Sequence, residues 1–392
     1  METIGVWLIG ARGSIASTTV VGHAAIVSGA EKPIGLVTER PAFAAAALPP
    51  LAALQFGGHE IRHGRLRDAA EAVLTACGRP GLAGTVTDVL DAVDARIRHG
   101  VVRGAGEMVE GDADDAVAVP TDAAAVAQLR ADLDAFRDEV GCARLVVVNL
   151  ASTEPQATPR PEWANLDALR AAMKTDARIL PASALYAMAA FEGGDAYINF
   201  TPSLGARVPA LQALALERGA VYAGCDGKTG ETLVKSVLAE LFTRRNLPVL
   251  SWFGQNILGN DDGRVLDNPA NRATKISSKD HLLGKILGYA PESKVRIEYV
   301  RSLEEWKIAW DHIHFGSFLG GRMSLQFTWS GIDSLLAAPL VLDLIRLAAL
   351  AQRRGEVGVL RALAPFFKDP MGTDEQRLVS QDEALLRWIA GA

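Results

Sequence analysis

Residues 6–18, Val6-Trp7-Leu8-Ile9-Gly10-Ala11-Arg12-Gly13-Ser14-Ile15-Ala16-Ser17-Thr18, pass from a short apolar run through a glycine turn into an apolar segment that extends to Ile26. A dinucleotide-binding unit begins with this order of strand, turn and helix, because backbone N–H groups at the helix start face the pyrophosphate of the ligand. Only Gly10 and Gly13 of the G-x-G-x-x-G pattern are present, so the turn alone is a weak indicator. The later segments decide the interpretation.

Four later segments indicate a doubly wound parallel sheet. Ile34-Gly35-Leu36-Val37 is predicted to be the second strand, with Glu39 at its end. An acidic residue there accepts hydrogen bonds from the ribose and disfavours a 2′-phosphate, which favours NAD over NADP. Leu145-Val146-Val147-Val148-Asn149 is typical of a strand buried on both faces, and Ala151-Ser152-Thr153-Glu154-Pro155 follows at its carboxyl end, where such sheets bind ligands. Tyr197-Ile198-Asn199-Phe200-Thr201-Pro202 repeats the pattern.

The pattern changes between Leu247 and Trp329, where apolar residues alternate with period two. The predicted half-buried strands are Val249–Trp252, Val295–Tyr299, His312–Phe315 and Ser324–Trp329. We expect an α/β protein with a doubly wound Rossmann-type NAD-binding domain over residues 1–245. An inserted α+β catalytic and oligomerisation domain, built on an open sheet, spans 246–330, and a C-terminal segment, 331–392, returns to the first domain. One face of the open sheet must be covered by helices or by another subunit.

Bulk properties exclude several classes of protein. The chain has 392 residues and a formal net charge of -6, which argues against nucleic acid as the main partner. We expect no signal peptide, because no basic segment followed by an apolar one stands at the N-terminus. Residues 335–350 are apolar but interrupted by Pro339, Asp343 and Arg346, so they predict a buried helix and no membrane partner. Three cysteines without C-x-x-C spacing favour a reduced, cytoplasmic setting.

Two apparent motifs have simpler interpretations. His59-Glu60-Ile61-Arg62-His63 matches H-E-x-x-H, but glycines on both sides argue against the helix that a zinc protease needs. His312 and His314 share a strand face, so they form either a metal pair or two ordinary polar residues. Gly224-Cys225-Asp226-Gly227-Lys228-Thr229-Gly230-Glu231-Thr232 fails the P-loop spacing. It still opens a helix from Glu231 to Phe242, so it either binds a sugar phosphate or only begins that helix.

Four lysines stand out as candidates for a site that binds a small anion. Lys275 and Lys279 would share a helix face, where they repel each other unless an anion joins them; a solvated basic face is the other interpretation. Lys307 follows Trp306, and Lys368 lies in an apolar, proline-bounded turn. A partly desolvated lysine can act as an acid or base near neutral pH.

Together these segments resemble the myo-inositol-1-phosphate synthase (inositol-3-phosphate synthase) family, most closely its archaeal type. The likeness runs over almost the full length of the chain. It rests on the following segments: Gly10–Gly13 after Val6–Ile9, Phe56-Gly57-Gly58-His59-Glu60, Asn149–Glu154, Asn199–Ser203, Ala223–Thr232, Asn256–Asn260, Ser278-Lys279 and Asp333–Leu340.

The resemblance implies an intramolecular lyase that uses NAD to cyclise glucose 6-phosphate without net redox change. Its catalytic residues would be Lys275, Lys279, Lys307, Lys368 and Asp226. The substrate phosphate would be held by Thr229, Gly230, Leu258, Asn260 and Lys279. The cofactor would be held by Gly10, Arg12, Gly13, Ser14, Ile15, Glu39, Ala151, Ser152, Thr153, Asp226 and Asp333. The resemblance also implies a homotetramer, and a divalent metal or a monovalent cation as a further cofactor stays open.

Alternatives remain at this point. Ser203–Arg207 and Trp252–Gln255 depart from the family pattern near the substrate. Related enzymes of natural-product pathways close a five-membered carbocycle from fructose 6-phosphate, and the same lysines could serve that reaction. A non-catalytic NAD sensor would not need the lysines, and an ordinary dehydrogenase would accumulate NADH.

Overall fold

The larger part of the protein is a seven-stranded parallel sheet. The computed structural model describes residues 2–268 and 282–391. Its strands are β1 (Ile4–Ile9), β2 (Leu54–Glu60), β3 (Ile97–His99), β4 (Arg144–Asn149), β5 (Ala196–Asn199), β6 (Val221–Gly224) and β11 (Gly358–Val359). The strand order is β11-β6-β5-β4-β1-β2-β3, and every pairing is parallel. The order reverses between β1 and β4, as in a doubly wound fold.

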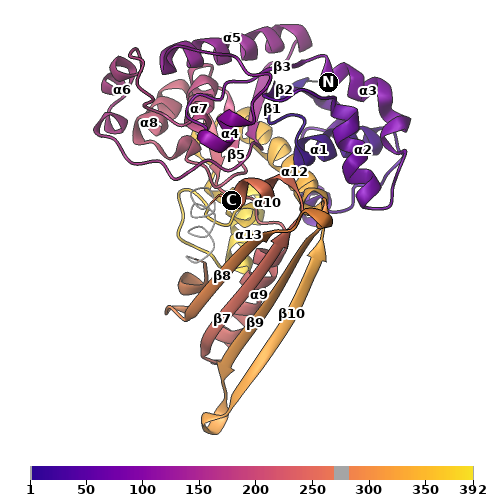
Figure 1. Ribbon diagram of the computed structural model, residues 1–392, viewed down its shortest axis with the longest axis vertical. Coiled ribbons are helices and arrows are strands. Elements are labelled where there is room, and N and C mark those ends of the chain that lie inside the picture. Colours follow the sequence, from indigo (N-terminus) through magenta and orange to yellow (C-terminus); the bar gives the residue numbers. More distant parts are fainter. Residues whose placement is uncertain (1, 269–281, 392) are drawn as a thin grey trace.

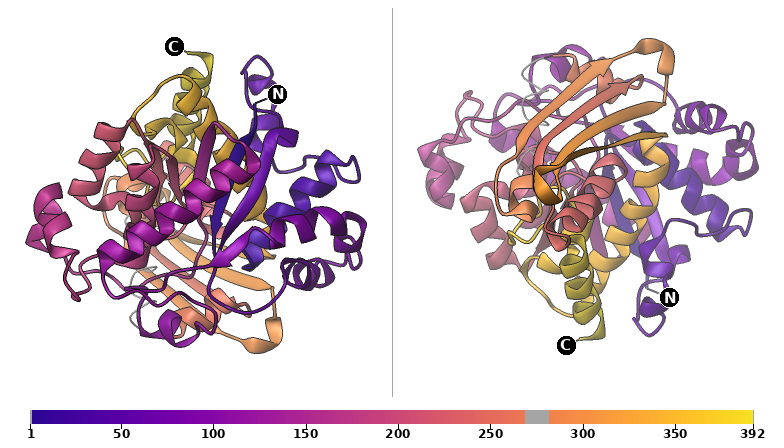
Figure 2. Two further views of the ribbon diagram at one scale, coloured as in Figure 1. Left: turned by 90° about the horizontal axis from the view of Figure 1, so that it is seen from above. Right: turned by 90° about the horizontal axis from the view of Figure 1, so that it is seen from below.

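Helices cover both faces of this sheet because its strands are apolar on both sides. Ile4, Val6 and Leu8 of β1 belong to one core, while Trp7 and Ile9 belong to the other. The first face carries α1 (Ser14–Val27), α2 (Leu66–Ala76), α3 (Thr87–Asp94) and α12 (Asp333–Arg353). The second face carries α5 (Asp122–Val140), α6 (Leu166–Ala172), α7 (Ala182–Glu192) and α8 (Pro209–Arg218). Figures 1 and 2 show the two layers.

The prediction of the second strand is wrong. Ile34–Val37 forms no strand, and Val37–Glu39 is a short 3-10 helix. The backbone N–H groups of Val37 and Thr38 donate to the Asp343 carboxylate of α12, at 2.6 and 3.0 Å, instead of to a neighbouring strand. Glu39 accordingly pairs with Arg346, at 2.7 Å.

The true second strand is β2, which contains Gly57 and Gly58 and therefore has a weak strand pattern. A side chain at Gly58 would collide with the carbonyl oxygen of Leu8, so the close approach of β1 and β2 requires glycine. His59 and Glu60 lie on this strand, which confirms that H-E-x-x-H is not a helical zinc motif here. His59 accepts from Trp7 Nε1 at 3.0 Å and contacts Asp132 at 3.2 Å.

Helix α12 brings the C-terminal segment back against the large sheet. It packs on α1 and on β4, β5 and β6. By length and composition it could cross a membrane, but 78% of its apolar window is buried inside the protein. That burial matches the core helix predicted from the interrupted apolar run. The last helix, α13 (Leu378–Ala390), follows the loop that carries Lys368.

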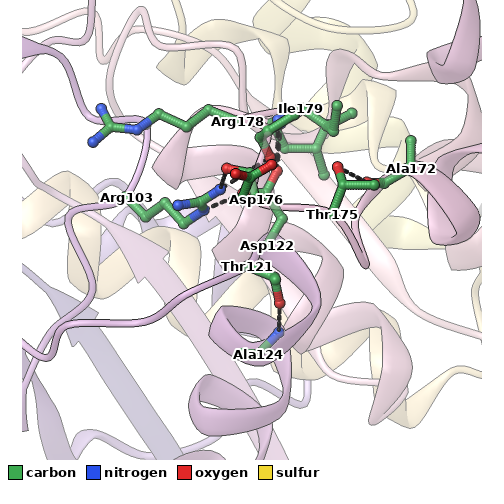
Figure 3. Close-up of polar contacts among 12 residues, drawn as sticks. Arg103, Thr121, Asp122, Ala124, Ala172, Thr175, Asp176, Arg178 and Ile179 are labelled. Atoms are coloured by element: carbon green, nitrogen blue, oxygen red, sulfur yellow. Dashed lines mark hydrogen bonds and ion pairs between the residues drawn. The ribbon is translucent and has the colours of Figure 1, made fainter.

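The segment before α7 is fixed by Asp122, the first residue of α5. The Asp122 carboxylate accepts from the N–H groups of Ile179 and Leu180, at 2.7 and 2.9 Å, and from Arg103 Nε at 2.6 Å (Figure 3). Thr121 caps the same helix by accepting from Ala124 N (Figure 3). This network sets the start of α7, which borders the cavity described below.

The smaller part is a four-stranded sheet that extends from the large one (Figure 1). Its strands are β7 (Val249–Leu258), β8 (Glu292–Tyr299), β9 (Lys307–Gly316) and β10 (Arg322–Gly331), in the order β10-β9-β7-β8. All four strands predicted in this region are confirmed. One face of this sheet packs against α9 (Glu231–Arg244) (Figure 2). The ring of Phe242 contacts those of Trp252 and Phe315 there. The opposite face carries the exposed Trp310.

Candidate functional site

The glycine turn lies where the strand order of the large sheet reverses. Gly10 has φ of +78°, and a side chain there would lie 3.1 Å from the Cα of Ala151, in the loop after β4. Gly13 precedes the first residue of α1, Ser14, and no side chain caps the helix. The free N–H groups of this helix start can therefore face an anion across the ends of β1 and β4.

A cavity of about 330 Å³ opens beside this turn. It lies between the carboxyl ends of the parallel strands and the base of the small sheet. The predicted site residues that line it are Arg12, Gly13, Ser14, Ile15, Ala151, Ser152, Thr153, Asp226, Thr229, Asn260, Asp333 and Lys368. Gly230, Leu258, Lys307 and Glu39 do not form part of its lining. Lys275 and Lys279 lie outside the described residues.

A second cavity of about 100 Å³ adjoins the first and shares Gly13, Arg62 and Leu150–Ser152 with it. Gly10 lines this second cavity. Its wall is mainly apolar and includes Ile61, Val101, Val102, Ala105, Val109 and Ala182. Polar side chains, among them Glu60, Arg62, Asp112, Glu154 and Arg264, complete the wall. The recess therefore offers an apolar surface for a flat aromatic base together with groups that can form hydrogen bonds at its edge.

Glu60 is a candidate site residue that the sequence analysis did not identify. It ends β2, is buried, and lines the second cavity. Its carboxylate accepts from the N–H groups of Arg12 and Ile61, each at 2.8 Å. The sequence does contain a signal for Glu60, since this acidic residue ends an extended segment within the family motif Phe56–Glu60. The incorrect prediction of a strand at Ile34–Val37 favoured Glu39 instead.

Lys368 and Asp226 form a buried ion pair of 2.8 Å at the floor of the first cavity. The backbone holds them in place, because Lys368 N donates to Asp226 O at 2.7 Å and Gly227 pairs with Phe367. Asp226 has φ of +62°, so the chain turns sharply at the start of the glycine-rich segment. The apolar turn around Lys368 therefore places its ammonium group at the end of β6.

Lys307 and Asp333 form a second pair, with 3.0 Å between Nζ and Oδ2. Thr229 donates to Asp333 Oδ1 at 3.4 Å, which ties the glycine-rich turn to the same carboxylate. Burial opposes a charged Lys307, but the Asp333 and Glu231 carboxylates outweigh it and raise the pKa of Lys307. Lys307 is thus held as a cation near the cavity.

Lys228 differs from these lysines. It is 2% exposed and donates to Gln381 Oε1 at 3.1 Å. Burial, and then the charge of Lys368, lower the pKa of Lys228 to about 8. The lysine of the P-loop-like segment therefore points away from the cavity and towards α13.

The residues expected to hold a phosphate come from two turns. Gly230 is the N-cap of α9, and a side chain there would contact Trp329 at 2.7 Å. Asn260 follows β7 and caps α10 (Asp261–Leu266) by accepting from Gly263 N at 3.1 Å. Leu258 is buried and pairs in register with Lys307 across β7 and β9. The fold brings these turns to the same end of the cavity as Asp333.

Among residues 2–268 and 282–391, no group of three or more His, Cys, Asp and Glu side chains is arranged to hold a metal ion. His312 and His314 lie on the face of β9 away from α9, and both are half-buried. They form no such group.

Comparisons with known proteins agree with this geometry. The profile of the myo-inositol-1-phosphate synthase family matches residues 4–389. An inositol-3-phosphate synthase from Bacteroides thetaiotaomicron is 33% identical over 394 residues, which covers 94% of this chain and 89% of that protein. The match to the Drosophila melanogaster enzyme is 32% identical and covers 58% of this chain but 42% of that longer protein.

A solved structure shows the same fold throughout. The crystal structure of a myo-inositol-1-phosphate synthase-related protein from Thermotoga maritima has a TM-score of 0.81 at 25% identity, over 99% of both chains. The archaeal subtype stays a prediction. Because the family profile spans almost the whole sequence, this chain belongs to the myo-inositol-1-phosphate synthase family, an NAD-dependent isomerase family with an NAD-binding domain.

Proposed function

We propose that this chain converts glucose 6-phosphate to 1D-myo-inositol 3-phosphate, also named myo-inositol 1-phosphate. The route is oxidation at C5, enolisation at C6, aldol closure onto C1 and reduction at C5. The observation that carries the proposal is that Lys368, Asp226 and Asp333 line one cavity with the glycine turn, while Lys307 forms an ion pair with Asp333 beside it. A redox-neutral cyclisation needs both a hydride carrier and groups that move protons and stabilise oxyanions.

The residues around the turn fit a dinucleotide. The α1 N-terminus and Gly10–Gly13 suit a pyrophosphate, and the apolar cavity beside Ile61 and Val101 suits an adenine. We assign the ribose-binding role to Glu60 in place of Glu39, because Glu60 ends the strand next to β1. When bound, NAD would accept the hydride from C5 and return it to C5.

The chain's own residues would supply the proton transfers and the electrostatics. Lys307, held as a cation by Asp333, suits stabilisation of the negative charge that develops on oxygen during oxidation and enolisation. Lys368, paired with Asp226 at the cavity floor, suits proton transfer at a sugar oxygen. By resemblance, Lys275 shares the proton transfers and Lys279 holds the phosphate.

The phosphate would lie between Thr229 and Asn260, which both line the cavity. The Thr229 hydroxyl and the N–H groups at the start of α9 are neutral donors, so a cation must balance the charge of a phosphate. The resemblance assigns that charge to Lys279.

The alternative is a carbocyclase that forms a five-membered ring from fructose 6-phosphate. The segment that departs from the family pattern ends at Arg207, which pairs at 2.5 Å with Asp369, the residue after Lys368 in the chain, although neither Arg207 nor Asp369 lines the two cavities. A change of sugar would need altered contacts at such a position.

One experiment tests both functions. The protein is incubated with NAD and either glucose 6-phosphate or fructose 6-phosphate, the product ring is identified by NMR, and absorbance is followed at the NADH band. The proposal predicts a six-membered ring from glucose 6-phosphate without accumulation of NADH. A cyclopentane from fructose 6-phosphate selects the alternative, and stoichiometric NADH would contradict both.

We also propose a homo-oligomer, in line with the expected tetramer, that associates through the sheet face opposite α9. That face exposes Trp310 and includes His312 and His314. No helix among residues 2–268 and 282–391 is seen to cover this face, and an uncovered sheet face that carries aromatic residues is a common site of association. A cytoplasmic location remains the expectation for this reaction.

A further inference from the structure

Glu305 reaches from the small sheet domain to the start of helix α1. It lies in the loop between Arg301–Leu303 and β9, and its Oε1 accepts from the Ser14 hydroxyl at 3.2 Å, 291 positions away in the chain. Both residues line the larger cavity. A carboxylate thus lies against the first side chain of α1, at the helix start where the proposed cofactor would place its pyrophosphate.

Few contacts hold the Glu305 carboxylate where it lies. Its Oε2 is buried and has no hydrogen-bond partner among the described residues, and no described lysine or arginine forms an ion pair with it. Burial raises the pKa of Glu305; the Ser14 hydrogen bond opposes this, while Asp261 and Glu304 add to it. A buried acceptor left unsatisfied costs stability and commonly marks a functional position.

The backbone beneath Glu305 is held on both sides. Gly259 N donates to Trp306 O at 3.2 Å, and a side chain at Gly259 would collide with the backbone of Glu304. Trp306 Nε1 donates to Ala76 O at the end of α2, at 3.3 Å. The Glu305 side chain takes part in neither contact, so it can move without breaking them.

We propose that Glu305 is a placeholder anion at the start of α1, which the cofactor pyrophosphate must displace. This inference rests on the proposed binding of NAD at that turn. Two anions cannot share one helix terminus without repulsion, so the Glu305 side chain rotates away from Ser14 when the dinucleotide binds. Glu305 thereby weakens the binding of NAD. The site then favours ligands whose other contacts are strong enough to offset the repulsion.

The test is isothermal titration of NAD and of ADP-ribose into wild type, Glu305→Gln and Glu304→Gln. Glu304→Gln removes the same charge one residue away, on an exposed side chain, and controls for long-range electrostatics. We expect Glu305→Gln to lower Kd for both ligands by about three- to tenfold, with a gain that shrinks as salt is added. Glu304→Gln should leave both values within about twofold.

The possible results separate the two proposals. If both ligands bind wild type but Glu305→Gln binds them equally or more weakly, Glu305 is inert or accepts from a ribose, and the placeholder role is overturned while the cofactor assignment stands. If neither ligand binds wild type or Glu305→Gln, the cofactor assignment fails and takes this inference with it. Matched thermal unfolding of the variants shows that any change is not a loss of fold.

Discussion

The Nζ atom of Lys307 lies 3.0 Å from Oδ2 of Asp333, and this pair joins the first residue of β9 to the first residue of α12. It is therefore a direct link between the small sheet and the helix that returns to the large one. Because the pair raises the pKa of Lys307 despite burial, the link also keeps a cation at the site.

Lys307→Met should lower kcat by about 10²–10⁴ with a smaller change in KM, because a cation that stabilises a developing oxyanion acts mainly on the barrier. Lys294→Met, on the exposed side of β8 in the same sheet, is the matched control and should behave like wild type. Steady-state kinetics checks both variants. Near-normal kcat for Lys307→Met would remove Lys307 from the mechanism.

Lys368→Ala should also lower kcat, by about 10²–10⁴ for loss of a proton-transfer group. Its removal leaves the buried Asp226 without this partner, so thermal unfolding must be measured alongside the kinetics. The exposed Lys285, which pairs with Asp374, supplies the control as Lys285→Ala. A well-folded Lys368→Ala enzyme with full activity would contradict the assignment.

Glu60→Gln should raise Kd for NAD by about tenfold, since a carboxylate accepts from ribose hydroxyls more strongly than an amide does. Glu39→Gln should change Kd little, because Glu39 faces Arg346 and lines neither cavity. Titration of NAD and NADP into the two variants checks this, and wild type should prefer NAD. Weakened binding in Glu39→Gln alone would restore the original assignment.

Glu154 should make stability fall as pH rises. Burial raises the pKa of Glu154 to about 7, against the hydrogen bonds from Ser183 N and Oγ. A carboxyl group whose pKa is higher in the folded state than in the unfolded state binds its proton more tightly in the folded state. Its contribution to stability is complete below the unfolded pKa and is lost as pH rises through the folded pKa of about 7. Relative to Glu154→Gln, wild type should lose about 2.5 kcal/mol of unfolding free energy between pH 5 and 8. Urea unfolding at each pH measures the difference; parallel curves would show that Glu154 does not titrate in this range.

Trp310→Glu should dissociate the oligomer, because a charge on the uncovered sheet face cannot be buried against a partner without a counterion. Light scattering at micromolar concentration measures the mass. Phe318→Glu, at the fully exposed turn between β9 and β10, tests whether the effect is specific to the face. A monomeric wild type would count against association altogether.

Much of the fold could be predicted because its signals are local. The apolar run at β4 and the period-two alternation of β7–β10 depend on neighbours in the sequence, and each appears where it was expected. The second strand could not be predicted in this way. Ile34–Val37 has the residues of a strand, but the backbone N–H of Val37 donates to Asp343, 306 positions away. The pattern of β2 is weak because the strand contains Gly57 and Gly58.

The order of the motifs and the apolar periodicity were enough to assign the family and to predict the parallel sheet, because both can be recognised from neighbouring residues in the chain. The partners of Lys368, Lys307 and Lys228 could be found only in the folded chain. Lys368 finds Asp226 across 142 positions, Lys307 finds Asp333, and Lys228 turns away towards Gln381. Each of these pairs joins residues that lie far apart in the sequence and come together where strand ends and loops meet in space. A buried charge needs a partner there, and no local sequence pattern predicts which residue that partner is.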